Sequence, residues 1–185
     1  MQYEPNTPLT RKLEMGQLER LDEDLEATMY EHTVSRLRAE GFEHYEISNW
    51  ARPGRSCRHN LVYWRSQNWL AFGPSASGHL DGTRFKVTPR LSEWLSASGD
   101  VPVVDVEHLD DLARTGERLM LELRLVEGIE AGELARLLDQ HDPTQERRAA
   151  IADGLRDGVL HQEDGRIKLT HEGRLLADSL LSRLV

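Results

Sequence analysis

The residue types best suited to chemistry lie near the middle of the chain, in the stretch CRHNLVYW at residues 57–64. This stretch lies inside a longer segment, residues 48–80, which contains no Asp or Glu although the 185-residue chain carries 32 acids and a net charge of -9. Arginines and aromatic residues are interleaved in that segment: Arg52, Arg55, Arg58 and Arg65, with Trp50, Tyr63, Trp64, Trp69 and Phe72. Guanidinium groups beside aromatic faces suit a flat apolar ligand that carries carboxylates or phosphates at its rim.

His59 is the candidate metal ligand of this stretch, because imidazole is the commonest side-chain ligand for metals. Cys57, two residues earlier, is a rival ligand, and the neighbouring Arg58 favours its thiolate form. Each residue also has a plainer interpretation. His59 is then a structural histidine among solvated arginines, and Cys57 a small buried side chain. The other seven histidines show no spacing typical of a metal site.

Three strings around these residues resemble one family. They are YEISNWARPG at residues 45–54, the signature HN-x-x-YW at residues 59–64, and Gly73-Pro74. Together they closely resemble the radical SAM heme chaperones, a group also described as oxygen-independent coproporphyrinogen III oxidase-like proteins. The resemblance extends over nearly the whole chain but covers only the second half of a family member.

This resemblance implies that the chain binds heme and delivers it, with His59 as the ligand to iron and with an acceptor protein as partner. A porphyrin needs an apolar slot, cations for its propionates and an axial ligand. The expected heme-site residues are His59, Asn60, Tyr63, Trp64, Arg52, Arg55 and Arg58.

The family also uses a [4Fe-4S] cluster and S-adenosylmethionine, and such a cluster requires several cysteine thiolates. This chain has a single cysteine, so we expect the cluster-bearing half to be missing and the chain to be inactive as an enzyme by itself. Two alternatives stay open. One is a fragment of an oxygen-independent coproporphyrinogen III oxidase, a radical SAM oxidative decarboxylase. The other is a module that only docks other proteins.

Composition narrows the class of protein. Hydrophobic residues make up 38% of the chain and charged residues 30%, and no run of 18 apolar residues predicts a membrane span. The N-terminus lacks the pattern of a signal peptide, and one cysteine is typical of a reducing cytoplasm. The net negative charge argues against nucleic-acid binding.

Periodicity predicts an α/β chain with two parts. Residues 1–100 contain a helix from Asp22 to about residue 40, a strand at 42–48 and a turn at Pro53-Gly54 that leads into 57–64 as a loop or short extended segment. This order favours the C-terminal part of a radical SAM (β/α) barrel. The boundary is expected at residues 98–102, where Gly and Pro coincide with a change in composition.

Residues 105–185 predict three helices, a hairpin turning at Asp164-Gly165 and a last helix, which is the order of a winged-helix-like α+β domain. The third helix is expected to start at Asp142 and Pro143. This part holds 11 Lys and Arg against 18 Asp and Glu, an excess of seven acids that does not suit DNA. A lid or docking role is the favoured interpretation.

Residues 1–100 hold too few strands to close a barrel, which needs roughly 200 residues or more. An open barrel edge exposes unpaired backbone groups. We therefore expect low solubility, dimerisation or dependence on a partner.

Overall fold

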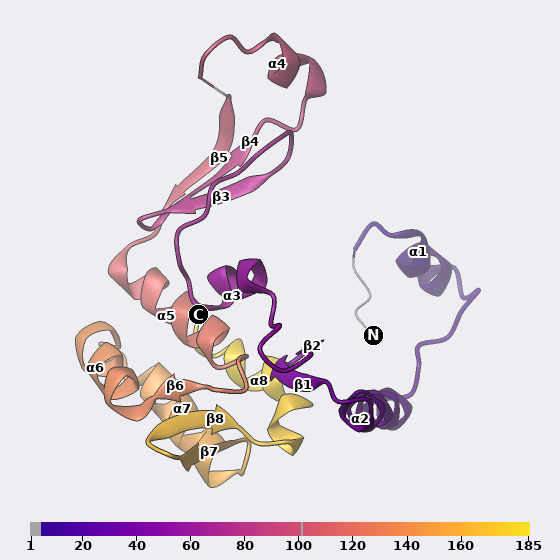
Figure 1. Ribbon diagram of the computed structural model, residues 1–185, viewed down its shortest axis with the longest axis vertical. Coiled ribbons are helices and arrows are strands. Elements are labelled where there is room, and N and C mark those ends of the chain that lie inside the picture. The colour runs from indigo at the N-terminus through magenta and orange to yellow at the C-terminus, as the bar shows by residue number, and fades with distance from the viewer. Residues whose placement is uncertain (1–4, 101) are drawn as a thin grey trace.

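The computed structural model of the chain describes residues 5–100 and 102–185, and it divides into a helical body and two projecting parts (Figure 1). In chain order the elements are α1 (Pro8–Glu14), α2 (Glu23–Ala39), β1 (Glu43–Glu46), β2 (Asn49–Ala51), α3 (Arg58–Trp64), β3 (Ser77–Leu80), β4 (Thr83–Val87), α4 (Leu91–Ser96), β5 (Val103–His108), α5 (Asp111–Glu122), β6 (Ile129–Glu130), α6 (Ala131–His141), α7 (Glu146–Arg156), β7 (Leu160–Glu163), β8 (Arg166–Leu169), the 3-10 helix η1 (Glu172–Arg174) and α8 (Ala177–Leu181).

The strands form three small sheets, β1-β2, β3-β4-β5 and β6-β8-β7, and every pairing between the described strands is antiparallel. The fold is therefore mixed α/β, as predicted. The parallel strand pairs of a (β/α) barrel do not occur between the described elements, so the barrel remnant expected in residues 1–100 is not confirmed. The predicted strand at 42–48 is the first arm of a hairpin, because β1 turns back into β2.

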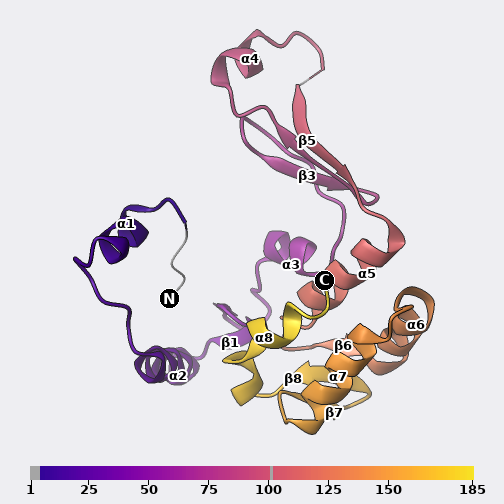
Figure 2. The same ribbon diagram turned by 180° about the vertical axis from the view of Figure 1, so that it is seen from behind.

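The second sheet projects from the body together with α4 (Figures 1 and 2). Its β3–β4 turn has positive φ at both Asp81 and Gly82, the backbone that a two-residue hairpin turn needs. Strand β5 pairs with β4, so the sheet continues across the predicted boundary at residues 98–102. Residue 101 of that boundary lies outside the described residues.

The buried core lies in the C-terminal body, where α5, α6, α7 and α8 surround the β6-β8-β7 sheet (Figure 2). Asp110 caps α5 by accepting a hydrogen bond from the Ala113 backbone amide at 2.8 Å. The apolar residues of α5 and α6 recur at three- and four-residue intervals, which places them on the core-facing side of each helix. The residues of these two helices and the turn after α5 that form this core are Leu119, Leu123, Leu134, Leu137 and Leu138.

The predicted order of helices and hairpin in this body is observed, with two corrections. The third helix begins at Glu146 rather than at Pro143, because Asp142 caps it from a distance: its carboxylate accepts from the backbone amides of Arg147 and Arg148. The last predicted helix is two short helices, η1 and α8. Thr170 caps η1 through a bond from the Gly173 amide.

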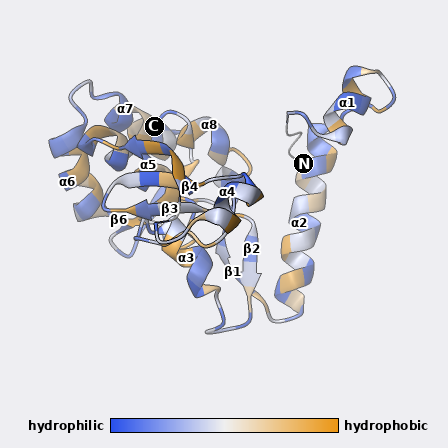
Figure 3. Ribbon diagram, turned by 90° about the horizontal axis from the view of Figure 1, so that it is seen from above, coloured by the Kyte–Doolittle hydropathy of each residue, from blue (hydrophilic) through white to orange (hydrophobic). Residues whose placement is uncertain are grey.

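Helix α2 begins as predicted at the Asp22 cap, whose carboxylate accepts from the Leu25 amide at 3.2 Å. The apolar residues of α2 do not form part of the buried core. None of the residues of α2 is buried, and Leu25 and Met29 are 47% and 52% exposed. Figure 3 shows α2 standing apart from the helical body, with hydrophobic residues on its surface.

The β1–β2 hairpin joins the N-terminal elements to the body. Glu46 forms an isolated antiparallel bridge with Leu125, and the Ile47 amide donates to the carbonyl of Arg124 at 3.2 Å. The end of α5 thus docks on the hairpin, and α3 lies against the same helix (Figure 1). Within the described part of the chain, no helix combines the length and apolar character that crossing a bilayer requires.

Candidate functional site

The HN-x-x-YW signature lies on a short helix, α3, where the sequence predicts a loop or extended segment. The helix starts with the Leu61 amide donating to the Cys57 carbonyl at 3.0 Å. Cys57 gives no side-chain cap, and a seven-residue helix is marginal in water without tertiary contacts. Packing against α5 and the hairpin supplies those contacts, and it is not visible in the local sequence.

The helical geometry divides the signature into two pairs. Residues four apart lie on one side of a helix, so His59 and Tyr63 share one side while Asn60 and Trp64 share another. His59 is exposed, and its Nε2 is hydrogen-bonded to the Tyr63 hydroxyl at 2.9 Å. Tyr63 therefore holds the imidazole of His59.

His59 and Tyr63, the pair on the exposed side of α3, begin a row of four aromatic rings. His59 meets Tyr63 edge to face at 4.9 Å between ring centroids, Tyr63 meets Trp69 at 4.8 Å, and Trp69 meets His79 at 4.9 Å. Trp69 is anchored by its indole N–H, which donates to the Ser77 carbonyl at 2.9 Å. The sequence singled out His59, Tyr63 and Trp69 but missed His79, because the bridge that pairs Trp69 with His79 is a tertiary contact.

Asn60 and Trp64, the other pair of the signature, hold α3 against the rest of the chain. The Asn60 side-chain amide donates to the Tyr45 hydroxyl at 3.2 Å. The ring of Trp64 faces the guanidinium of Arg124, 4.9 Å from the ring centroid, and its buried indole N–H has no acceptor among the described residues. Trp64 thus packs on an arginine from the end of α5, and not on those of the acid-free segment.

A buried carboxylate holds that arginine. Glu46 has no exposed surface, and its Oε1 accepts from Arg124 at 2.9 Å. Its Oε2 accepts from the Ser48 amide at 3.0 Å and from the Asn49 side chain at 2.6 Å. Both oxygens of the Glu46 carboxylate therefore have hydrogen-bond donors, and Arg124 compensates its negative charge. Sequence reasoning placed Glu46 in a matching string but gave it no role, because its partner lies 78 residues away.

The predicted arginines do not all gather around His59. Arg52 donates to the Glu40 carbonyl at 2.8 Å and lies over the Phe42 ring at 4.6 Å, at the end of α2. Arg55 is exposed in the turn after β2, and Arg58 is exposed at the first residue of α3. Cys57 is also exposed, so the interpretation of it as a small buried side chain is wrong.

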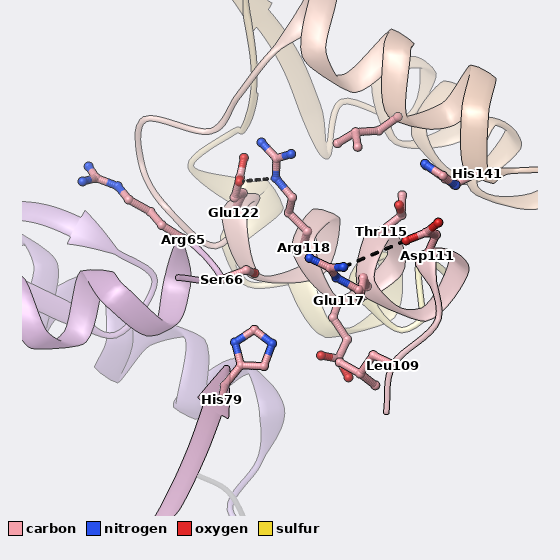
Figure 4. A pocket seen from close by; sticks show the side chains of 12 residues that line it. Arg65, Ser66, His79, Leu109, Asp111, Thr115, Glu117, Arg118, Glu122 and His141 are labelled. Carbon is pink, nitrogen blue, oxygen red and sulfur yellow. Dashed lines mark hydrogen bonds and ion pairs between the residues drawn. The ribbon is translucent and has the colours of Figure 1, made fainter. Parts of the chain in front are cut away.

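A cavity of about 400 Å³ lies between α5, the end of α3 and β3, and Figure 4 shows the side chains that line it. His79 reaches it from β3, and its other neighbours are mostly charged. Arg118 pairs with Glu122 and with Glu133, both at 2.7 Å, and Arg65 pairs with Glu127 at 3.0 Å. Because these charges neutralise one another, the cavity suits water better than a flat apolar ligand.

The described residues contain no group of three or more His, Cys, Asp or Glu side chains arranged to hold a metal ion. A metal that arrives in a porphyrin needs only one or two protein ligands, since the macrocycle supplies the others. The role of His59 as a ligand to heme iron therefore stays a prediction.

Comparison with known proteins identifies the family. A family model described as the HemN C-terminal domain matches residues 109–176. The chain is 39% identical over 184 residues to the heme chaperone HemW of Mycobacterium tuberculosis and 30% identical over 183 residues to that of Bacillus subtilis. The matches cover 98% and 96% of this chain but 45% and 47% of those relatives, so the chain spans about half of their length.

The fold also matches a solved structure, the coproporphyrinogen III oxidase HemN from Escherichia coli, a radical SAM enzyme. The TM-score is 0.61 at 16% identity, over 83% of this chain and 39% of that one. At this identity the match supports the fold alone. The sequence matches show that the chain belongs to the family that includes HemW and carries a HemN C-terminal domain.

Proposed function

We propose that this chain binds heme and takes part in its delivery, as the names of its relatives suggest. The observation that carries the proposal is the pair His59 and Tyr63 on the exposed side of α3. A histidine that ligates a metal is usually held by a hydrogen bond to its other ring nitrogen. Tyr63 provides such a bond at Nε2, which leaves Nδ1 for iron.

The other residues of the signature are assigned by their contacts. Tyr63 and Trp69 form the start of an aromatic wall beside His59. Arg55 and Arg58 are exposed near the start of α3 and are proposed to pair with propionates, for which guanidinium groups are well suited. Asn60 and Trp64 act indirectly by fixing the helix, and Arg52 by fixing the hairpin.

We propose that the wider architecture follows the family. Residues 1–100 would belong to a radical SAM barrel whose remaining strands are not part of this chain, and residues 105–185 would be a winged-helix-like domain that acts as a lid or docking module. Strand β5 connects the two parts, because it pairs with β4 of the first part and leads into the second. The acceptor of the heme is proposed to be another protein, met in the cytoplasm.

The [4Fe-4S] cluster and S-adenosylmethionine of the family do not fit the described residues. Cys57 is the single cysteine of the chain, and a cluster needs several thiolates. We propose that these groups are bound by residues outside this chain, and we assign no radical reaction to it.

A hemin titration of the purified chain tests the heme site. The His59→Ala variant is expected to lose the Soret shift of the native chain, and Tyr63→Phe to keep the spectrum but bind about tenfold more weakly, because the orienting bond is gone. His161→Ala removes an exposed histidine elsewhere and is the matched control. Cys57→Ser tests the rival ligand. A spectrum of His59→Ala identical to that of the native chain would remove His59 as the ligand.

A further inference from the structure

A second cavity lies on the other side of the β1–β2 hairpin from α3. It has a volume of about 320 Å³ and is enclosed by α2, the hairpin, the segment after α5 and the start of η1. An adjoining cavity of about 420 Å³ shares Val34, Arg38 and His171 with it. Volumes of this size are typical of small-molecule sites. Figure 1 shows α2 beside β1, the two elements that form its walls.

The hairpin itself separates this cavity from the heme site. Neighbouring side chains of a strand point to opposite faces. Tyr45 meets Asn60 of α3 on one face, whereas His44 lines the cavity on the other. A ligand in this cavity would therefore not contact His59.

Aromatic rings form part of the wall of this cavity. Trp50 and His44 stack almost parallel, with 4.5 Å between ring centroids and 10° between planes, and Phe42 also lines the cavity. Val34 and Val126 complete the apolar lining. The indole N–H of Trp50 is buried and has no acceptor among the described residues, so it is a donor that a ligand oxygen can satisfy.

The polar groups of the cavity are cationic or neutral. Burial lowers the pKa of His44, which is therefore the neutral imidazole near pH 7. Its Nε2–H donates to the Ile47 carbonyl at 2.9 Å, so its Nδ1 accepts from Arg174 at 3.3 Å. This bond fixes the Arg174 guanidinium at the wall of the cavity while its other N–H groups remain available.

No carboxylate lines this cavity, although the chain carries 32 acids. Arg38 and Arg174 form no ion pair with a carboxylate within residues 5–100 and 102–185, and Glu31 lines only the adjoining cavity. Two guanidinium groups without carboxylate partners, beside a tryptophan face and an unsatisfied indole N–H, make a site for a negative group on a flat ring system.

We propose that this cavity binds a planar aromatic carboxylate. The ring system lies along Trp50 and Phe42, and the carboxylate accepts hydrogen bonds from Arg38 and Arg174. The site is separate from the heme site on α3 and goes beyond the proposed function.

Calorimetric titration with naphthalene-2-carboxylate tests the site, and naphthalene-2-carboxamide is the neutral probe of the same shape. The carboxylate is expected to bind at least tenfold more tightly than the amide. Arg38→Ala and Arg174→Ala are each expected to weaken carboxylate binding about tenfold, the loss of one charge-assisted hydrogen bond. Arg36→Ala removes a charge from the same helix, where Arg36 pairs with Glu40, and is expected to leave binding unchanged.

Further variants separate this site from the heme site. Trp50→Phe keeps an aromatic wall without the N–H and is expected to weaken binding less than the arginine variants do, whereas His59→Ala is expected to leave it unchanged. Circular dichroism confirms the fold of each variant. Equal binding of the acid and the amide, or binding by Arg38→Ala and Arg174→Ala as tight as by Arg36→Ala, overturns the proposal. A failure of hemin to bind at His59 leaves these outcomes unaffected.

Discussion

Glu46 links the signature helix to the C-terminal body at the scale of single residues. Its carboxylate has no exposed surface and binds Arg124, which in turn lies over Trp64 of α3. A buried ion pair contributes little compared with an apolar pair of the same shape, but breaking one half of it leaves an uncompensated charge. The orientation of α3 therefore depends on a residue outside the signature.

We predict that Glu46→Ala destabilises the chain by about 3–5 kcal/mol, because Arg124 and the Asn49 side chain lose their buried acceptor. Urea denaturation measures the change in the free energy of unfolding. Glu40→Ala removes an exposed carboxylate paired with Arg36 and is expected to cost no more than about 1 kcal/mol. Similar losses in the two variants would contradict the assigned role of Glu46.

Glu133 gives a prediction for pH dependence. Its hydrogen bonds from Arg136, opposed in part by burial and reinforced by Arg118, lower the pKa of its carboxyl from 4.5 to about 2. A carboxyl with a lowered folded-state pKa stabilises the fold above its unfolded pKa and loses that contribution as pH falls. The window is therefore from about pH 4.5 down to about pH 2.

We predict that Glu133→Gln lowers the stability at pH 7 by about 1 kcal/mol, the scale of a partly exposed ion network. The difference from the native chain should shrink as the pH falls through that window. Denaturation curves at pH 7, 4 and 3 measure this trend. A difference that stays constant across the three values would show that the charge of Glu133 is not the cause. Glu172→Gln, at an exposed residue without an ion pair in the described structure, is the control.

At the scale of elements, the segment that connects β8 to α8 depends on a glycine in η1. A Cβ at Gly173 would collide with the backbone carbonyl of Val159, while Gly132 in α6 has ordinary contact distances around that position. The backbone of η1 lies close to the segment at residues 158–159 because Thr170 bonds to both. The Thr170 hydroxyl accepts from the Gly173 amide at 2.8 Å and donates to the Gly158 carbonyl at 2.7 Å.

We predict opposite effects for alanine at these two glycines. Gly173→Ala should destabilise the body by more than about 2 kcal/mol, because backbone must move. Gly132→Ala should stabilise it by about 0.4–1 kcal/mol, because the backbone there suits alanine and alanine lowers the conformational entropy of the unfolded chain. Thermal unfolding followed by circular dichroism measures both. Equal melting temperatures for the two variants would contradict the close approach at η1.

At the scale of the whole molecule, apolar surface is concentrated on parts that stand away from the core. Leu25 and Met29 on α2, Phe72 before β3 and Leu95 on α4 are all at least 47% exposed. Exposed apolar patches mark surfaces that bind another protein or cause aggregation. This distribution supports the expectation of self-association or a partner, which followed from the sequence on other grounds.

We predict that the chain self-associates through α2, and that the double variant Leu25→Lys with Met29→Glu shifts it toward monomer. Light scattering coupled to size-exclusion chromatography measures the mass in solution. Leu176→Lys changes a residue of similar exposure, 54%, on the C-terminal body and should leave the association unchanged. A monomeric native chain, or an association that the α2 variant leaves intact, would rule out this surface.

Local interactions made several features readable from the sequence alone. The Asp22 cap, the Asp164-Gly165 turn and the apolar spacing of α5 and α6 are each set within a few residues. The family strings are also local in the sequence, and they indicated a resemblance to heme chaperones, while the role of His59 stays a prediction.

Long-range contacts decided the rest. Residues 58–64 are helical because α5 and Tyr45 pack against them, and the arginine that faces Trp64 comes from 60 residues further along the chain. Glu46 has its role only because Arg124 is folded against it, and the cavity beside Trp50 exists only where α2, the hairpin and η1 meet. Periodicity describes the side of an element that faces inward but not the residue it meets there, because that depends on how distant segments pack.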